Sequence, residues 1–341
     1  MHLRAGDVAQ SRGGVEVKAK KLFQLSLGIA FAAVFLWLVF RHISVDDIAA
    51  AVREADAGYV FGAVIVFGAG YACRIERWRR MLIQDNPSLR WSGCAGPFMG
   101  CVAANNVLPF RAGDALRAFG FNGRLGTSAA TSLATVMVER LLDLLMVSAF
   151  LGIAMAWFGT SSSALVGVGG SVLIGGAAAI LLVLLFPSLF RPLAIVCVRM
   201  AARVSPGLGS KAASQVDKLF AALGHLSRGA TMLALVGWSA LAWLAEGVVF
   251  WLCALALPSI SEPLAAWLAL PIGTLATVIP STPGFVGTFD YFVAQAMAAP
   301  GNTAAAATAF ALLVHTVLWL PPTILGGLYL LANPAKQLKV I

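Results

Sequence analysis

Long apolar stretches with few charged residues recur along the whole chain and constrain its fold more than any other feature. A helix needs about 20 consecutive apolar residues to cross a bilayer. The stretches of this kind, of which the second is somewhat short, cover residues 22–40, 58–73, 127–158, 164–186, 231–257 and 304–332. Charged residues make up only 11% of the chain, whereas a soluble domain carries about a quarter. We therefore predict an all-α polytopic membrane protein with about six full transmembrane helices.

Two further apolar regions are interrupted by helix-breaking residues. The first, residues 94–109, contains Gly96, Pro97 and the Asn105-Asn106 pair and is short for a span. The second, residues 264–299, contains Pro271 and then the proline- and glycine-rich run 280–290. Broken helices inside a membrane must be buried in protein or line a wet cavity. We predict two re-entrant hairpins, and paired crossings of the membrane are the alternative.

The basic residues indicate the orientation. If the N-terminus is cytoplasmic, all of the 24 Lys and Arg except Arg41, Arg53 and Arg140 fall on or near the cytoplasmic face. The stretch 193–204 is amphipathic and predicts a helix on the membrane surface. We expect a multi-pass protein of the bacterial inner membrane with both termini in the cytoplasm.

This partition gives one transmembrane domain, residues 22–332, between a basic tail, residues 1–21, and a short tail, residues 333–341. The order span, span, broken segment, span occurs in residues 22–158 and again in residues 164–332, starting from opposite sides. An inverted repeat has this organisation and typically places a binding site where its halves meet. Ordinary membrane helices rich in Gly and Pro are the alternative.

The first broken region ends in a polar run that predicts a binding site. Two arginines flank one carboxylate here and leave a surplus positive charge, which a phosphate could balance by bonding a guanidinium fork. The residues assigned to this part of the site are Asn105, Asn106, Pro109, Arg111, Asp114 and Arg117. The alternative is an internally paired cluster, or arginines that set the depth of a helix.

Three ionisable residues lie inside the predicted span 127–158, namely Glu139, Arg140 and Asp143. An ionised residue at the bilayer centre costs about 2.5–3.5 kcal/mol on insertion scales, so these need partners or water. Arg140 can reach Asp143 at i+3, which leaves one carboxylate to bind an arginine of the first cluster, take up a proton or contact a headgroup. For proton coupling the candidates are Glu139, Asp143 and Glu246, although Glu246 could equally bond neighbouring helices.

The second broken region supplies flexible backbone, free amide groups and a carboxylate near a polar ligand. Its assigned residues are Pro280, Thr282, Pro283, Gly284, Gly287 and Asp290. The alternative is an ordinary loop with an interfacial aspartate. His315 is a lone histidine among apolar residues, and such a residue is more often a packing partner than a proton carrier.

Three motifs in this order resemble the lysylphosphatidylglycerol synthase transmembrane-region family. That family includes the flippase domain of the multiple peptide resistance factor and stand-alone relatives of isoprenoid-lipid-linked glycan and hopanoid pathways. The chain departs from the family pattern at Asp114, where Glu is more usual, and at Phe285 and Val286, which replace a glycine-rich continuation. The motifs are Asn106-x-x-Leu-Pro-x-Arg-x-Gly-Asp-x-x-Arg117, Glu139-Arg140-x-x-Asp143 and Pro280-x-Thr-Pro-Gly284-x-x-Gly287.

The resemblance implies a flippase that moves a phosphate-bearing lipid or lipid-linked group between leaflets, such as a phospholipid, a polyprenyl-phosphate-linked lipid or a hopanoid-type lipid. We expect Arg111 and Arg117 to hold the phosphate. No run typical of ATP binding, metal binding or nucleic-acid binding is present in the sequence. We assign no catalytic residue, metal or cofactor, and expect a lipid substrate and either a homodimer or association with a lipid or glycan biosynthetic enzyme. The alternatives are a membrane-embedded lipid or glycosyl transferase, and a scaffold or regulator of a lipid or glycan synthase.

Overall fold

The computed structural model describes residues 53–108, 111–159, 164–205, 230–279 and 283–333, with scattered positions between 207 and 224. Throughout these described residues the regular elements are helices, so the fold is all-α. The predicted features that lie outside the described residues are the tail 1–21, the span 22–40, the tail beyond Asn333, and Pro109, Pro280 and Thr282.

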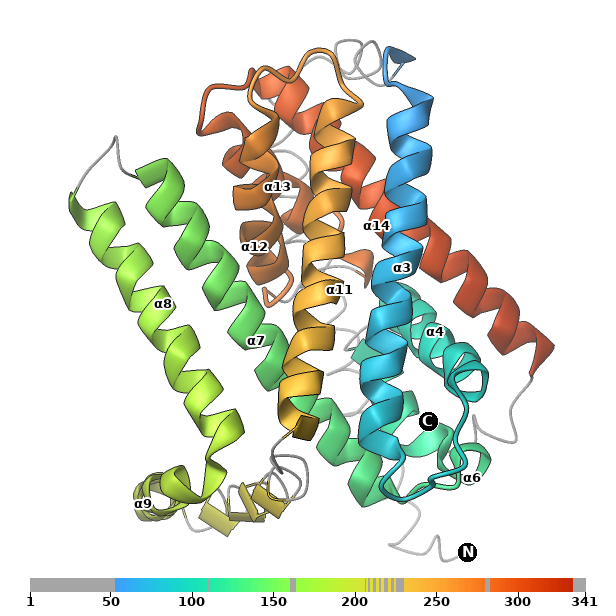
Figure 1. Cartoon of the computed structure of the whole chain (residues 1–341), viewed down its shortest axis with the longest axis vertical. Coiled ribbons are helices and arrows are strands. Elements are labelled where there is room, and N and C mark those ends of the chain that lie inside the picture. The colour runs from blue at the N-terminus through green and yellow to red at the C-terminus, as the bar shows by residue number, and fades with distance from the viewer. Residues whose placement is uncertain are drawn as a thin grey trace, which may run out of the picture.

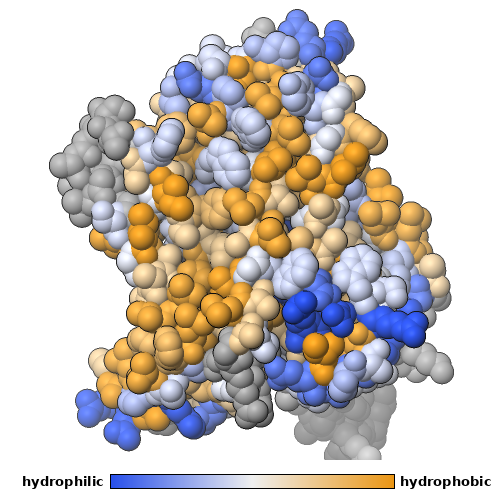
Figure 2. Space-filling view, in the orientation of Figure 1, coloured by the Kyte–Doolittle hydropathy of each residue, from blue (hydrophilic) through white to orange (hydrophobic). Residues whose placement is uncertain are grey.

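Four helices in the described chain are each long and apolar enough to cross a membrane. They are α3 (Ala57–Leu82), α7 (Ala129–Gly159), α11 (Ala230–Leu255) and α14 (Ala304–Ala332). A fifth candidate is α8 (Ala164–Leu185) with α9 (Pro187–Val204), which bends away by 106° where the surface helix was predicted. Figure 1 shows α9 across the lower end of α8. Figure 2 shows hydrophobic side chains over the middle of the visible face and hydrophilic ones at both ends, as a membrane protein requires.

Helix α3 is longer than the sequence predicted. The predicted span ended at Cys73 and placed the basic residues that follow in a loop, but the helix continues through Arg74 and Arg77 to its end at Leu82. At about 1.5 Å per residue its 26 residues extend about 39 Å. The predicted boundary was wrong because both arginines form ion pairs with carboxylates on other helices, which offset the free-energy cost of burying the charges.

The first broken region is a hairpin that enters and leaves at the same end of the molecule. The side-chain amide of Asn86, just before the hairpin, donates to the carbonyl of Leu125, the last residue of the hairpin, at 2.8 Å. Similarly, the Ser128 backbone N–H donates to the Asp85 carboxylate at 3.1 Å. The hairpin consists of α4 (Trp91–Val107), α5 (Ala112–Ala115), the π-helical turn η2 (Leu116–Gly120) and α6 (Asn122–Leu125).

Helix α4 continues through Gly96 and Pro97, where the sequence predicted interruptions, and the chain leaves it only after Val107. The close approach of α14 explains the glycines. A Cβ on Gly96 would lie 2.2 Å from the Tyr329 ring, and a Cβ on Gly326 would lie 2.0 Å from the backbone oxygen of Met99. Small residues at such contacts let two membrane helices pack backbone to backbone.

The second broken region is also a hairpin, formed by η3 (Pro263–Ala265), α12 (Ala266–Ala276), η4 (Pro283–Phe285) and α13 (Thr288–Ala298). Its two ends are joined because the Asn302 side chain accepts from the Glu262 backbone N–H at 2.9 Å and donates to the Met297 carbonyl at 2.8 Å. With 11 residues, about 17 Å, neither α12 nor α13 could cross a bilayer. Figure 1 shows both in the upper half of the bundle.

The two hairpins therefore enter from opposite ends, the first from the end where α3 finishes and the second from the end where α11 finishes (Figure 1). These directions are compatible with an inverted repeat. Homology between residues 22–158 and 164–332 stays a prediction.

Candidate functional site

The tips of the two hairpins meet beside the middle of α14. From the first tip, the Asn106 side-chain amide donates to the Thr323 hydroxyl at 2.8 Å, and its backbone carbonyl accepts from the Trp319 indole at 3.4 Å. From the second tip, Gly284 lies against the same indole, where a Cβ would be 2.7 Å from Nε1. Gly284 has a φ of 75°, which glycine adopts without strain. Asn106 and Gly284, both predicted site residues, are thus brought together.

Arg111 spans the junction between the tips. Its backbone is left-handed, with φ 51° and ψ 45°, a conformation that costs a non-glycine residue about 1–2 kcal/mol. Its Nη2 lies 3.4 Å from the Thr277 hydroxyl, at the long limit of a hydrogen bond, and its Cζ lies 5.7 Å from the centroid of the Phe285 ring. No carboxylate among the described residues forms an ion pair with it. Arg111 therefore holds its charge at the junction without an anionic partner there.

Arg117, in contrast, has a carboxylate partner. Its Nη1 and Nη2 contact the two oxygens of Glu139 at 3.1 and 2.5 Å in a bidentate pair. The guanidinium lies between two aromatic rings, with Cζ 4.5 Å from the Trp78 centroid and 4.6 Å from that of Phe98. Arg117 and Glu139 are both buried. The structure thus shows for Arg117 the pairing with Glu139 that the sequence left open.

Arg77 belongs to the same network and was missed by the sequence reasoning. This side chain, 1% exposed, contacts Glu139 Oε1 at 3.1 Å, Asp143 Oδ1 at 3.0 Å and the Ser239 hydroxyl at 2.9 Å. It joins α3 to α7 and α11. The shortness of the predicted span 58–73 was the available signal, because extending it to about 20 residues brings Arg77 to its edge.

Asp114 and Arg140 form the outer part of the network. The Asn105 side-chain amide makes two hydrogen bonds with Asp114. It accepts from the Asp114 backbone N–H at 3.1 Å and donates to Asp114 Oδ1 at 3.0 Å. Arg140 contacts Asp114 Oδ2 at 3.2 Å and Asp143 Oδ2 at 3.7 Å, so the predicted i+3 pair is present. The Arg140 side chain is 44% exposed, which leaves this end of the network open to a ligand.

The charges of this network balance. Its three arginines and three carboxylates are Arg77, Arg117, Arg140, Asp114, Glu139 and Asp143. Arg111 is then a positive charge in excess at the end of the network where the tips meet. A partly buried cation without an anionic partner attracts an anionic group electrostatically.

A second polar group lies on the other hairpin. Asp290, 1% exposed, contacts Nδ1 of His315 at 2.7 Å through Oδ1 and accepts the Gly287 backbone N–H at 2.8 Å through Oδ2. His315 Nε2 lies 2.9 Å from the Gly284 carbonyl oxygen. Pro283 belongs to η4, beside Gly284. Asp290 and His315 therefore hold the tip of the second hairpin to α14.

Residues 25–326 match the family described as "Lysylphosphatidylglycerol synthase TM region". The chain belongs to this family. It is also similar to a protein named "Glycosyltransferase AglD" from Haloferax volcanii, with 28% identity over 319 residues. The match covers 85% of this chain and 51% of that protein, so the chain spans about half the length of this relative.

Glu246 was also predicted as a proton-coupling residue of this lysylphosphatidylglycerol synthase transmembrane-region protein. It forms an ion pair with Arg74, which joins α11 to α3. The Arg74 guanidinium also lies 5.7 Å from the Tyr71 ring centroid. This pair joins the same two helices as the contact of Arg77 with Ser239. Glu246 thus has a partner on a neighbouring helix, the alternative that the sequence allowed.

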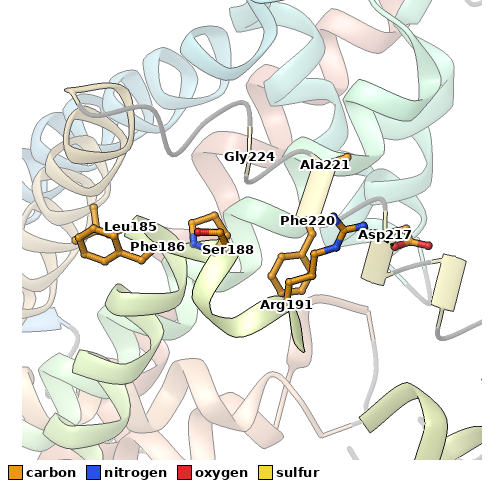
Figure 3. Close-up of a pocket in the computed structure, with 9 residues that line it drawn as sticks. Leu185, Phe186, Ser188, Arg191, Asp217, Phe220, Ala221 and Gly224 are labelled. Carbon is orange, nitrogen blue, oxygen red and sulfur yellow. Dashed lines mark ion pairs between the residues drawn. The ribbon is translucent and has the colours of Figure 1, made fainter. Parts of the chain in front are cut away.

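A cavity of about 460 Å³ lies apart from these residues, at the corner between α8 and α9. Figure 3 shows Arg191 of α9 and Asp217 directed toward one another at this cavity. They are 3.6 Å apart, with side chains 59% and 69% exposed, and surface pairs of this kind contribute little stability. The cavity includes none of the predicted site residues.

Proposed function

We propose that this protein moves a phosphate-bearing lipid or lipid-linked group between the leaflets of the bacterial inner membrane. The observation that carries the proposal is Arg111, an arginine without an ion-pair partner among the described residues, at the point where the two hairpin tips meet. The substrate classes that fit are a phospholipid, a polyprenyl-phosphate-linked lipid and a hopanoid-type lipid with a phosphate. Membership of the family supports a lipid-related function.

Phosphate binding at Arg111 would displace little. Its contact with Thr277 is long, at 3.4 Å, whereas a phosphate would accept two short charge-assisted hydrogen bonds from the guanidinium. The phosphate would also neutralise the surplus charge of the junction. The left-handed backbone of Arg111 directs the side chain to the facing tip at Thr277 and Phe285, which supports a role in binding rather than in packing its own hairpin.

In this proposal Arg117 contacts the phosphate only if it leaves Glu139, and breaking a buried pair costs about 3–5 kcal/mol. We therefore assign Arg117 and Arg77 to holding the first hairpin against α3 and α7 in the conformation seen. Arg140 is half-exposed and adjacent to Asp114, so it is the second cation available to a headgroup.

The two hairpins would act as the gates. Each enters from one end and both end at Arg111, so movement of one tip opens the site toward one leaflet only. Gly284 and Gly287, with φ of 75° and 84°, provide backbone that can change conformation at the second tip. As part of this proposal we expect both termini in the cytoplasm.

The test is transport of a fluorescent phospholipid by purified protein in vesicles, measured by chemical quenching of the outer leaflet. We expect Arg111→Ala to lower the rate at least about tenfold, and Arg111→Lys to retain part of it, because a lysine keeps the charge but loses the fork. Arg191→Ala is the matched control, an exposed arginine away from the junction, and should transport like wild type. Wild-type rates in Arg111→Ala, or equal transport of a phosphate-free analogue, would contradict the proposal.

The second candidate function is a membrane-embedded transferase, or a membrane partner of one. It is favoured by the relative named a glycosyltransferase, of which this chain matches about half. Incubating the purified protein with lipid phosphate and sugar-nucleotide donors discriminates the two. Product formed by the protein alone, without lipid movement in vesicles, would favour the transferase.

A further inference from the structure

His315 lies between two oxygen acceptors. Its Nδ1 is 2.7 Å from the Asp290 carboxylate and its Nε2 is 2.9 Å from the Gly284 carbonyl oxygen. A neutral imidazole carries one N–H, so it can donate to only one of them and turns a lone pair toward the other. An imidazolium carries two and satisfies both. The geometry therefore favours a histidine that holds an additional proton.

Both oxygens of Asp290 have hydrogen-bond partners. Its second oxygen accepts the backbone N–H of Gly287, and it stands in the first turn of α13, where the helix dipole stabilises negative charge. The pair of imidazolium and carboxylate is neutral overall, and a neutral pair is far cheaper inside a membrane than either ion alone.

The other titratable groups on the elements around His315 are charged groups that form ion pairs elsewhere, or cysteine thiols and tyrosine phenols. Charged groups on α3 and α11 pair with one another or with α7, as in Arg74 with Glu246. Helix α12 carries no titratable residue, and α4 carries two cysteines. Helix α13 carries Tyr291 beside Asp290, and α14 carries Tyr329. In the described part of the chain, Asp290 is the one charged group in contact with His315.

We propose that His315, paired with Asp290, is the site that takes up and releases the proton that drives transport. This inference rests on the proposed lipid transport for its purpose, but the protonation of His315 can be measured without it. Glu139 and Glu246, two of the residues that the sequence suggested, each form an ion pair with an arginine instead.

One residue, Phe285, links the His315 site to the proposed headgroup site at Arg111. Losing the proton leaves either the Gly284 carbonyl or Oδ1 of Asp290 without its donor on His315, which loosens η4 from α14. The next residue, Phe285, carries the ring against which Arg111 lies. Protonation of His315 therefore fixes the second tip at Arg111, and deprotonation releases it. By linkage, an anion on Arg111 that prefers one tip position changes the proton affinity of His315.

The first experiment reads the proton directly. A variant with His2→Gln, His42→Gln and His225→Gln, purified through a tag without histidine, leaves His315 as the sole histidine and its contacts unaltered. Nitrogen-15 NMR of the labelled ring in lipid vesicles should show both nitrogens protonated at neutral pH, and Asp290→Asn should leave one of them without a proton. A neutral ring at pH 7 that Asp290→Asn leaves unaltered would overturn the proposal, whatever the transport assay shows.

The second experiment reads the coupling. Wild-type transport of the fluorescent phospholipid should change with an imposed pH gradient, and His315→Gln should lose this dependence while still moving lipid down its own gradient. Thr316→Ala, a polar neighbour with an exposed side chain that bonds only its own helix, is the matched control and should keep the wild-type dependence. Unaltered pH dependence in His315→Gln would overturn the proposal. Absence of transport in wild type as well would instead contradict the proposed function.

Discussion

Replacing Glu139 with glutamine should strongly destabilise the folded protein. Glu139 is shared by Arg77 and Arg117, whose side chains are only 1% and 5% exposed. Removing the carboxylate leaves Arg117 without an ion pair and leaves Arg77 with Asp143 alone. Taking one partner from a buried pair costs about 3–5 kcal/mol, because the remaining charge stays away from water. We expect a loss of free energy of unfolding in this range.

The assay is thermal unfolding of the detergent-solubilised protein, followed by tryptophan fluorescence. At about 2.1 cal/mol/K per residue, the unfolding entropy of this 341-residue chain is about 0.7 kcal/mol/K, so a loss of about 3–5 kcal/mol should lower Tm by about 4–7 °C. Glu76→Gln is the matched control. Glu76 pairs with Arg79 and Arg80, whose side chains are 25% and 40% exposed, and we expect a cost below about 1 kcal/mol.

A double-mutant cycle separates the loss of the Glu139–Arg117 ion pair from any other effect of the introduced glutamine. If Glu139 acts through Arg117, then Arg117→Met should cost less in the Glu139→Gln background than in wild type. A Tm for Glu139→Gln within about 2 °C of the Glu76→Gln control would refute the reasoning, because the two arginines would then be satisfied without the carboxylate.

Three further substitutions test the packing. Gly113→Ala should lower the yield of monodisperse protein on size-exclusion chromatography, since its Cβ would lie 1.9 Å from the backbone oxygen of Cys101; wild-type behaviour would contradict that contact. Gly326→Leu should do the same by separating α14 from α4 at Met99, and should also lower Tm. Asn302→Ala should cost about 1–3 kcal/mol in thermal unfolding, because it removes the partner of the buried Met297 carbonyl and of the Glu262 N–H at the two ends of the second hairpin; no loss would argue against that contact.

The sequence predicted the positions of most helices because hydrophobic length fixes them. The last span was predicted at residues 304–332, which are the bounds of α14, and α7, α8 and α11 agree with the predicted spans within about two residues. The end of α3 could not be predicted in this way. Arg74 and Arg77 enter the bundle through partners more than sixty residues away, and such pairs leave no local pattern in the chain.

The candidate site could be predicted as a set of residues but not as a set of contacts. The sequence placed Arg111 and Arg117 in one role, whereas their surroundings differ: Arg117 is paired and sandwiched between rings, and Arg111 lies across the tip junction. The re-entry of both hairpins depends on Asn86 and Asn302, which join chain segments about forty residues apart. The two acceptors of His315 come from the tip and from helix α13 of the second hairpin, so the sequence indicated only a lone histidine.

Native mass spectrometry of the gently purified protein, with identification of the bound lipid, tests the central claim most directly. Wild type and the Arg191→Ala control should retain one phosphate-bearing lipid, and Arg111→Ala should lose it. Adding Arg117→Ala to Arg111→Ala should lower stability without altering this outcome further, since Arg117 is held by Glu139. Equal retention of the same lipid by wild type and Arg111→Ala would contradict the assignment of Arg111 as the phosphate-binding residue.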